Sequence, residues 1–278
     1  MKQINSTIYP SIAQSFGITG IAVLSIIIMG IISPFLNTFF GVEGGQLVFT
    51  ILAMGIPLWI VSVIKKKQTG SATFDLSVKN IGVLPYLIIM SAALLIGIIM
   101  PIGSLIPIPE VLKESFATLA GQTGIFTFIL MVIAAPVLEE LLFRGIILDG
   151  LLKRYSPVKS ILISALLFGI VHLNPWQFVT GFTMGILIGW VYSKNKCVLT
   201  SIIMHASVNL TAYVLRIFLD REQHLSGTLT EIYGGATNLT LIIAASIVVI
   251  SIGVFILNKA FNKEDLDINK RDGIISNA

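Results

Sequence analysis

The chain contains few charged residues, one cysteine and three histidines. Charged side chains make up only 12% of its 278 residues, whereas soluble domains average about 25%. This composition excludes an ordinary soluble fold. The single cysteine, Cys197, excludes an internal disulfide framework and a thiolate metal cluster. Any chemistry must therefore come from a small set of acids, histidines and amides.

Apolar residues are what the chain has in quantity. They make up 55% of the sequence, and the mean hydropathy is +0.93, which is typical of an integral membrane protein. Apolar runs long enough to cross a hydrocarbon core predict an all-α polytopic membrane bundle of about eight transmembrane helices, forming one domain over residues 1–278. The predicted spans are 16–40, 46–64, 83–104, 124–150, 157–173, 176–193, 198–218 and 237–258.

The basic residues fall mainly on one side of this predicted bundle. Fourteen of the 18 lie in the N-terminal segment, in alternate loops and in the polar C-terminal tail 259–278. Because basic loops stay in the cytoplasm, both termini are predicted to be cytoplasmic. Topology and attraction to membrane lipid then explain the net charge of +4, so no nucleic-acid partner is expected. The fourteen are Lys2, Lys65, Lys66, Lys67, Lys79, Lys153, Arg154, Lys159, Lys194, Lys196, Lys259, Lys263, Lys270 and Arg271.

Polar residues within the spans gather in three consecutive patches of the region 124–218. The patches are EELLFRG at 139–145, SALLFGIVH at 164–172 and HASVN at 205–209. They contain two of the three histidines and the carboxylates nearest to a membrane centre. An ionised side chain at that depth costs roughly a few kcal/mol, so a functional site is the first explanation to test.

Helical spacing separates the two adjacent acids of the first patch. At about 100° per residue, Arg144 lies about 40° from Glu140 around the helix but about 140° from Glu139. We therefore predict an i,i+4 ion pair between Glu140 and Arg144 that supports the architecture. Glu139 is left to face another part of the bundle.

The other two patches each place two side chains on one helix face. Phe168 and His172 are four residues apart on the fifth predicted span, and His205 and Asn209 are four apart on the seventh. With a rise of about 1.5 Å per residue, Glu139 and Asn209 lie about 16 Å from the predicted cytoplasmic ends, His205 about 10 Å and His172 about 21 Å. The four polar groups are therefore predicted to meet in one buried site.

Proline and glycine positions support this convergence. Pro136 lacks an N–H and lies one turn before Glu139, so it is predicted to kink the helix and to free a carbonyl beside the site. Gly181, Gly185 and Gly189 recur at four-residue intervals, which predicts a smooth stripe against which another helix can pack closely.

A carboxylate, two histidines and an amide in a dry pocket suit amide hydrolysis. Glu139 with one histidine could hold and deprotonate a water molecule, while the other histidine and Asn209 stabilise the oxyanion. Alternatively, Glu139, His172 and His205 could bind a divalent metal such as zinc, with a bound water as nucleophile. The chain lacks an H-E-x-x-H pair on one helix, so ligand spacing does not indicate a metal, and no cofactor is required.

The three patches, in this order and spacing, resemble the CPBP family of intramembrane proteases. That family includes CAAX prenyl endopeptidases and bacterial enzymes linked to bacteriocin processing and self-immunity. The resemblance covers residues 136–210 and implies a protease, either metallo- or glutamate-dependent. It implies that Glu139 and His172 activate the water, that His205 and Asn209 form the oxyanion site, and that Glu140, Arg144 and Phe168 support them.

Two other functions are compatible with the same residues. One is a catalytically silent membrane scaffold that confers immunity or regulates a partner. The other is a proton-coupled transporter, in which Glu139 and the histidines relay protons; its usual pair of similar halves is absent from the sequence. The protease reading predicts a peptide or membrane-protein substrate and a bacterial cell membrane as the location.

Overall fold

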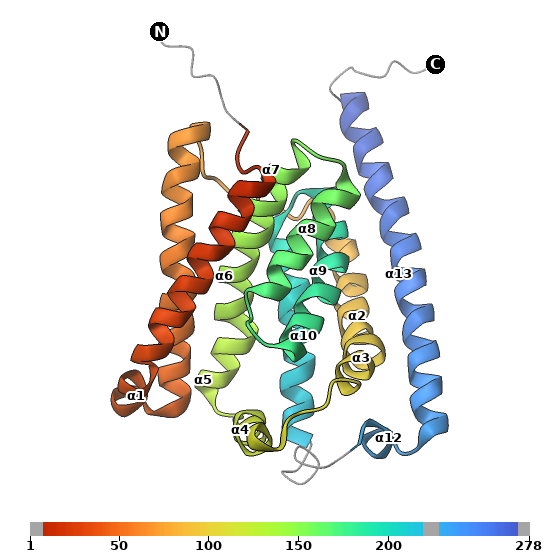
Figure 1. The fold of residues 1–278 in the computed structure, drawn as a ribbon. Coiled ribbons are helices and arrows are strands. Elements are labelled where there is room, and N and C mark those ends of the chain that lie inside the picture. Colours follow the sequence, from red (N-terminus) through yellow and green to blue (C-terminus); the bar gives the residue numbers. More distant parts are fainter. Residues whose placement is uncertain (1–7, 219–227, 272–278) are drawn as a thin grey trace.

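The computed structural model describes residues 8–218 and 228–271, and in these ranges the chain forms helices without a strand (Figure 1). The predicted all-α fold is therefore confirmed. In the described ranges, five helices are long and apolar enough to cross a membrane. The count of eight spans stays a prediction.

The first helix, α1 (Ile12–Thr69), is divided at Gly41, whose φ of 70° and ψ of 171° are not helical. Glycine adopts a positive φ without steric cost, so the chain reverses there. Two arms result, one descending from the N-terminus and one returning beside it (Figure 1). They correspond to the predicted spans 16–40 and 46–64.

The middle of the chain forms two longer helical stretches that include π-helical turns. The first contains η1 (Ile81–Val83), α2 (Leu84–Leu94), η2 (Leu95–Ile99) and α3 (Met100–Ser104). After the short helix α4 (Glu110–Ala120), the second contains α5 (Ile125–Phe128), η3 (Ile129–Ala134), α6 (Ala135–Leu142), η4 (Phe143–Leu148) and α7 (Asp149–Leu152). The segments η2, η3 and η4 are π-helices, which occur frequently at functional sites.

The remaining elements are α8 (Pro157–Ile170), α9 (Pro175–Asn195), α10 (Val198–Phe218), α12 (Leu229–Ile232) and α13 (Ala236–Arg271). Helices α8 and α9 form a tight antiparallel hairpin. Helix α13 continues into the predicted polar tail as far as Arg271, and residues 272–278 lie outside the described part. The two ends of the described chain lie at the same end of the bundle (Figure 1).

The stretch α5–α7 is the centre of the fold. It contacts α1 on one side and α8, α9 and α10 on the others. Its residues Leu142, Phe143, Ile146 and Ile147 are fully buried in the main hydrophobic core. The polar residues that this stretch carries are consequently held away from lipid, which is where a charged group can be stabilised inside a membrane.

The glycine stripe of α9 packs directly on α8, as predicted. A Cβ atom built on Gly185 would lie 2.9 Å from Cβ and 3.0 Å from Cα of Ala165. A Cβ on Gly181 would lie 3.2 Å from the carbonyl oxygen of Phe168, and one on Gly189 would lie 3.2 Å from Ile161. The hairpin therefore depends on the absence of side chains at these three positions.

Replacing Gly185 with alanine should destabilise the protein because α9 must move away from α8. Overpacking of this kind costs about 1–3 kcal/mol, and the measurement is the thermal unfolding temperature in detergent. Gly20→Ala is the matched control, since a Cβ there meets nothing within 4 Å. Alanine is favoured over glycine in a helix by about 1 kcal/mol, so the control should be neutral or stabilising. Equal unfolding temperatures for the two variants would contradict the close packing.

Candidate active site

A buried ionic cluster joins the first and third polar patches. Glu140 Oε1 accepts a hydrogen bond from Arg144 Nη1 at 2.9 Å, which confirms the predicted i,i+4 pair. The same oxygen lies 2.9 Å from His205 Nδ1 on α10. A carboxylate oxygen only accepts, so Nδ1 carries the proton and donates. Glu140 therefore fixes the orientation of His205 as well as the position of Arg144.

This cluster is shielded from solvent. The side chains of Glu140 and Arg144 are 0% and 1% exposed, and that of His205 is 4% exposed. Removing one member of a buried ion pair costs roughly 3–5 kcal/mol because the other charge is left without compensation. The three groups thus form a single unit whose members depend on one another.

The ring of Phe168 lies at the centre of the site. Its centroid is 4.5 Å from Arg144 Cζ, in a cation–π arrangement. Edge-on contacts place the same ring 5.2 Å from the ring of His172 and 5.7 Å from that of His205. Phe168 is itself fully buried. The predicted supporting residue therefore touches the ion pair and both histidines.

Glu139 points away from this cluster and into a cleft. Its Oε2 atom lies 3.9 Å from His205 Nε2, on the opposite side of the imidazole from Glu140. An open cleft of about 600 Å³ is lined by Glu139, His172, His205 and Asn209. The structure thus brings all four predicted polar residues to one cavity, and it separates the two neighbouring acids as helical spacing predicted.

His172 lies just beyond the C-terminal end of α8, where the chain turns towards α9. Its Nδ1 atom is 2.8 Å from the carbonyl oxygen of Phe168. A carbonyl oxygen only accepts, so Nδ1 carries the proton and a neutral His172 has its free lone pair on Nε2. The residue with the greatest predicted depth therefore still reaches the cleft.

Asn209 is held by a carbonyl that the backbone of the π-helix η3 leaves available. The N–H of Ala135 bonds to the carbonyl of Leu130, five residues earlier. The next donor in this register would be Pro136, which has no N–H, so the carbonyl of Met131 lacks that partner. Asn209 Nδ2 donates to this oxygen at 2.8 Å. Pro136 thus frees a carbonyl beside the site, as predicted from the sequence.

Two basic residues near the site were assigned differently from the sequence. Arg216, counted with the loops, lies in the last turn of α10, lines the cleft and donates to the carbonyl of Leu119 at 3.0 Å. Its spacing of seven residues from Asn209 was the available signal, because such residues share a helix face. Lys65, counted as a loop lysine, is buried and donates to the carbonyl of Gly145 at 2.9 Å.

The metal-binding alternative was also compared with the geometry. Within residues 8–218 and 228–271, no group of three or more His, Cys, Asp or Glu side chains could hold one metal ion. The set Glu139, His172 and His205 does not fit a metal in this arrangement. The chemistry considered below therefore uses only the side chains of the chain.

The motif-bearing region matches a known protein family. Residues 121–211 match the family described as type II CAAX prenyl endopeptidase Rce1-like. This confirms the resemblance predicted from the three patches. No solved structure matches the chain significantly.

Three curated proteins illustrate the similarity. UPF0177 proteins YxdF and YbdI of Lactococcus lactis are 38% and 30% identical over 79 and 95 residues, covering 28% and 34% of this chain and 43% and 51% of theirs. CAAX prenyl protease 2 of Methanococcus maripaludis is 26% identical over 191 residues, covering 59% of this chain and 68% of its own. The chain thus spans about half the length of the two Lactococcus relatives.

Replacing Glu140 with glutamine should destabilise the fold, because Arg144 and His205 would lose the carboxylate between them. The expected loss is about 3–5 kcal/mol of unfolding free energy, measured by denaturation in detergent. The matched control is Glu139→Gln, which changes the neighbouring acid at the cleft wall and should cost much less. A similar loss for the two variants would contradict the division between the adjacent acids.

Proposed function

Residues 121–211 belong to the type II CAAX prenyl endopeptidase Rce1-like family, and from this premise we propose that the chain is an intramembrane endopeptidase. Its substrate would be a membrane-associated peptide or protein. The observation that carries the proposal is the pair formed by Glu139 Oε2 and His205 Nε2, 3.9 Å apart at the wall of a cleft of about 600 Å³. A water molecule about 2.8 Å from each atom would bridge them.

Glu139 is the proposed general base. Its carboxylate lies at the cleft wall, whereas that of Glu140 is occupied by Arg144 and His205. The Nε2 lone pair of a neutral His172 is the second acceptor that can hold the attacking water. After taking the proton, Glu139 would return it to the leaving amine, which converts the base of the first step into the acid of the second.

His205 and Asn209 are the proposed oxyanion donors. Glu139, Glu140 and Arg144 together carry one net negative charge, so an imidazolium at His205 balances the cluster. In that form Nε2 carries a hydrogen and can donate to the developing oxyanion, while Nδ1 still donates to Glu140. Asn209 uses one amide hydrogen on Met131 and has a second one for the same oxygen.

The two other functions receive less support from the geometry. A proton-coupled carrier needs access to the site from both membrane faces, yet fully buried side chains, including Leu142, Ile146 and Ile147, fill the bundle on one side of the cluster. A silent immunity or regulatory scaffold would share the fold and differ only in activity. The variants below separate the protease from the scaffold.

Replacing Glu139 with glutamine should abolish cleavage, since an amide cannot accept the proton of the attacking water. Membranes from cells that produce the wild type or Glu139→Gln would be compared by quantitative sequencing of protein N-termini. Cut sites present only with the wild type identify the substrate. A synthetic peptide spanning such a site should then be cleaved about 10²–10⁴-fold more slowly by Glu139→Gln and by His172→Ala in reconstituted vesicles.

Asp75→Asn is the matched control because this acid is exposed and lies outside the cleft. It should cleave at the wild-type rate. Identical sets of N-termini with the wild type and Glu139→Gln would contradict the protease and favour the silent scaffold.

A further inference from the structure

The cleft extends from the proposed catalytic residues towards one end of the bundle only. Its inner part is lined by Glu139, His205 and Ala135, and its outer part by Gln122 and Arg216. Gln122 precedes the N-terminus of α5, and Arg216 lies in the last turn of α10. Both elements end at the side of the bundle opposite to the two ends of the described chain (Figure 1). We call this side the open end.

Packed side chains close the way from the site to the other end. Along the central stretch, the residues that follow Glu140 towards α7 are 0–1% exposed; they are Leu142, Phe143, Arg144, Ile146, Ile147, Leu148 and Leu151. Phe168 covers the same level from α8 and is 0% exposed. We call the end beyond this plug the closed end.

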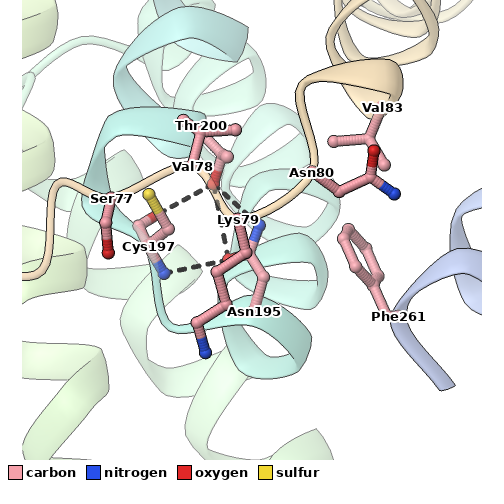
Figure 2. A pocket seen from close by; sticks show the side chains of 9 residues that line it. All are labelled: Ser77, Val78, Lys79, Asn80, Val83, Asn195, Cys197, Thr200 and Phe261. Carbon is pink, nitrogen blue, oxygen red and sulfur yellow. Dashed lines mark hydrogen bonds between the residues drawn. The ribbon is translucent and has the colours of Figure 1, made fainter. Parts of the chain in front are cut away.

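The surface of the closed end is itself tightly assembled. Segment 77–80, the turn between α9 and α10, and Phe261 of α13 meet there around Cys197 (Figure 2). The cavity between them is about 10 Å³, which is room for about one water molecule. A larger hollow of about 300 Å³, lined by Lys65, Ser71 and their neighbours, contains none of the four site residues.

The basic residues show which membrane face each end occupies. Lys65 and Lys153 both pair with Asp149 at the closed end, and Arg154 donates to the carbonyl of Ile8. Within the described part, the basic side chains of the closed end are Lys65, Lys66, Lys67, Lys79, Lys153, Arg154, Lys159, Lys194, Lys196, Lys259 and Lys263. The open end has Lys113 and Arg216 in the same ranges. Since basic segments stay in the cytoplasm, the closed end is the cytoplasmic one.

We infer that the cleft admits its substrate from the extracytoplasmic side of the membrane. The substrate class is then a peptide, or a segment of a membrane protein, whose scissile bond is presented on that face. This inference about the substrate rests on the proposed protease function, whereas the direction of the cleft rests only on the packing and the charges. Arg216 is the basic residue that such a segment meets at the cleft wall.

Cysteine accessibility measures the direction without any cleavage assay. Cys197 is buried and would first be replaced by alanine. Single cysteines would then be placed at Ala135 in the inner cleft, at Gln122 in its outer part and at Ser71 on the closed end. A small, charged, membrane-impermeant methanethiosulfonate is applied to intact cells and to inverted membrane vesicles. Blocked thiols are read as loss of the gel shift that a polyethylene glycol maleimide gives after denaturation.

We expect Ala135→Cys and Gln122→Cys to lose the gel shift in intact cells, and Ser71→Cys to lose it only in inverted vesicles. Blocking of Ala135→Cys from inverted vesicles alone, or from neither side, would overturn the inference. Blocking of Ser71→Cys in intact cells would also overturn it, since the closed end would then face outwards. Failure of the protease proposal looks different: the labelling pattern stays as expected while Glu139→Gln leaves all N-termini unchanged.

Discussion

The buried carboxylate of Glu140 is the constraint on which the rest of the site depends. Its Oε1 atom receives hydrogen bonds from Arg144 and from His205, so one oxygen joins two helices that are distant in sequence. A charge in a membrane interior is tolerated only where partners compensate it. By compensating Glu140 with a histidine, the fold also turns the other nitrogen of that ring towards Glu139 and the cleft. Stability and the proposed chemistry therefore share one interaction.

Irregular backbone supplies the other parts of the site. A π-helical turn before Pro136 leaves the carbonyl of Met131 for Asn209, and the carbonyl of Phe168 at the end of α8 holds His172. Inside a membrane, freed carbonyls must find donors within the protein. Here the donors are the polar side chains proposed for catalysis. Their orientation is consequently set by backbone atoms, which move less than side chains would.

The sequence predicted the features that follow from local spacing. The pair Glu140–Arg144, the separate direction of Glu139 and the carbonyl freed by Pro136 each depend on a few neighbouring residues of one helix. The bond between Glu140 and His205 could not be derived, because it spans 65 positions and depends on how two helices pack. Arg216 was placed in a loop because its charge outweighed its helical spacing. The π-helices were also missed, since they depend on hydrogen-bond register and leave no simple sequence pattern.

A double-mutant cycle on unfolding free energy tests the central claim, that Glu140 holds His205 while Glu139 remains available to react. The variants are Glu140→Gln, His205→Gln and their combination, with a parallel cycle for Glu139 and His205. The account predicts a coupling of about 1.5–3 kcal/mol for Glu140 with His205, as expected for a hydrogen bond to a charged group. It predicts a clearly smaller coupling for Glu139, whose nearest oxygen is 3.9 Å away. Additive effects in the first cycle, or a larger coupling in the second, would contradict it.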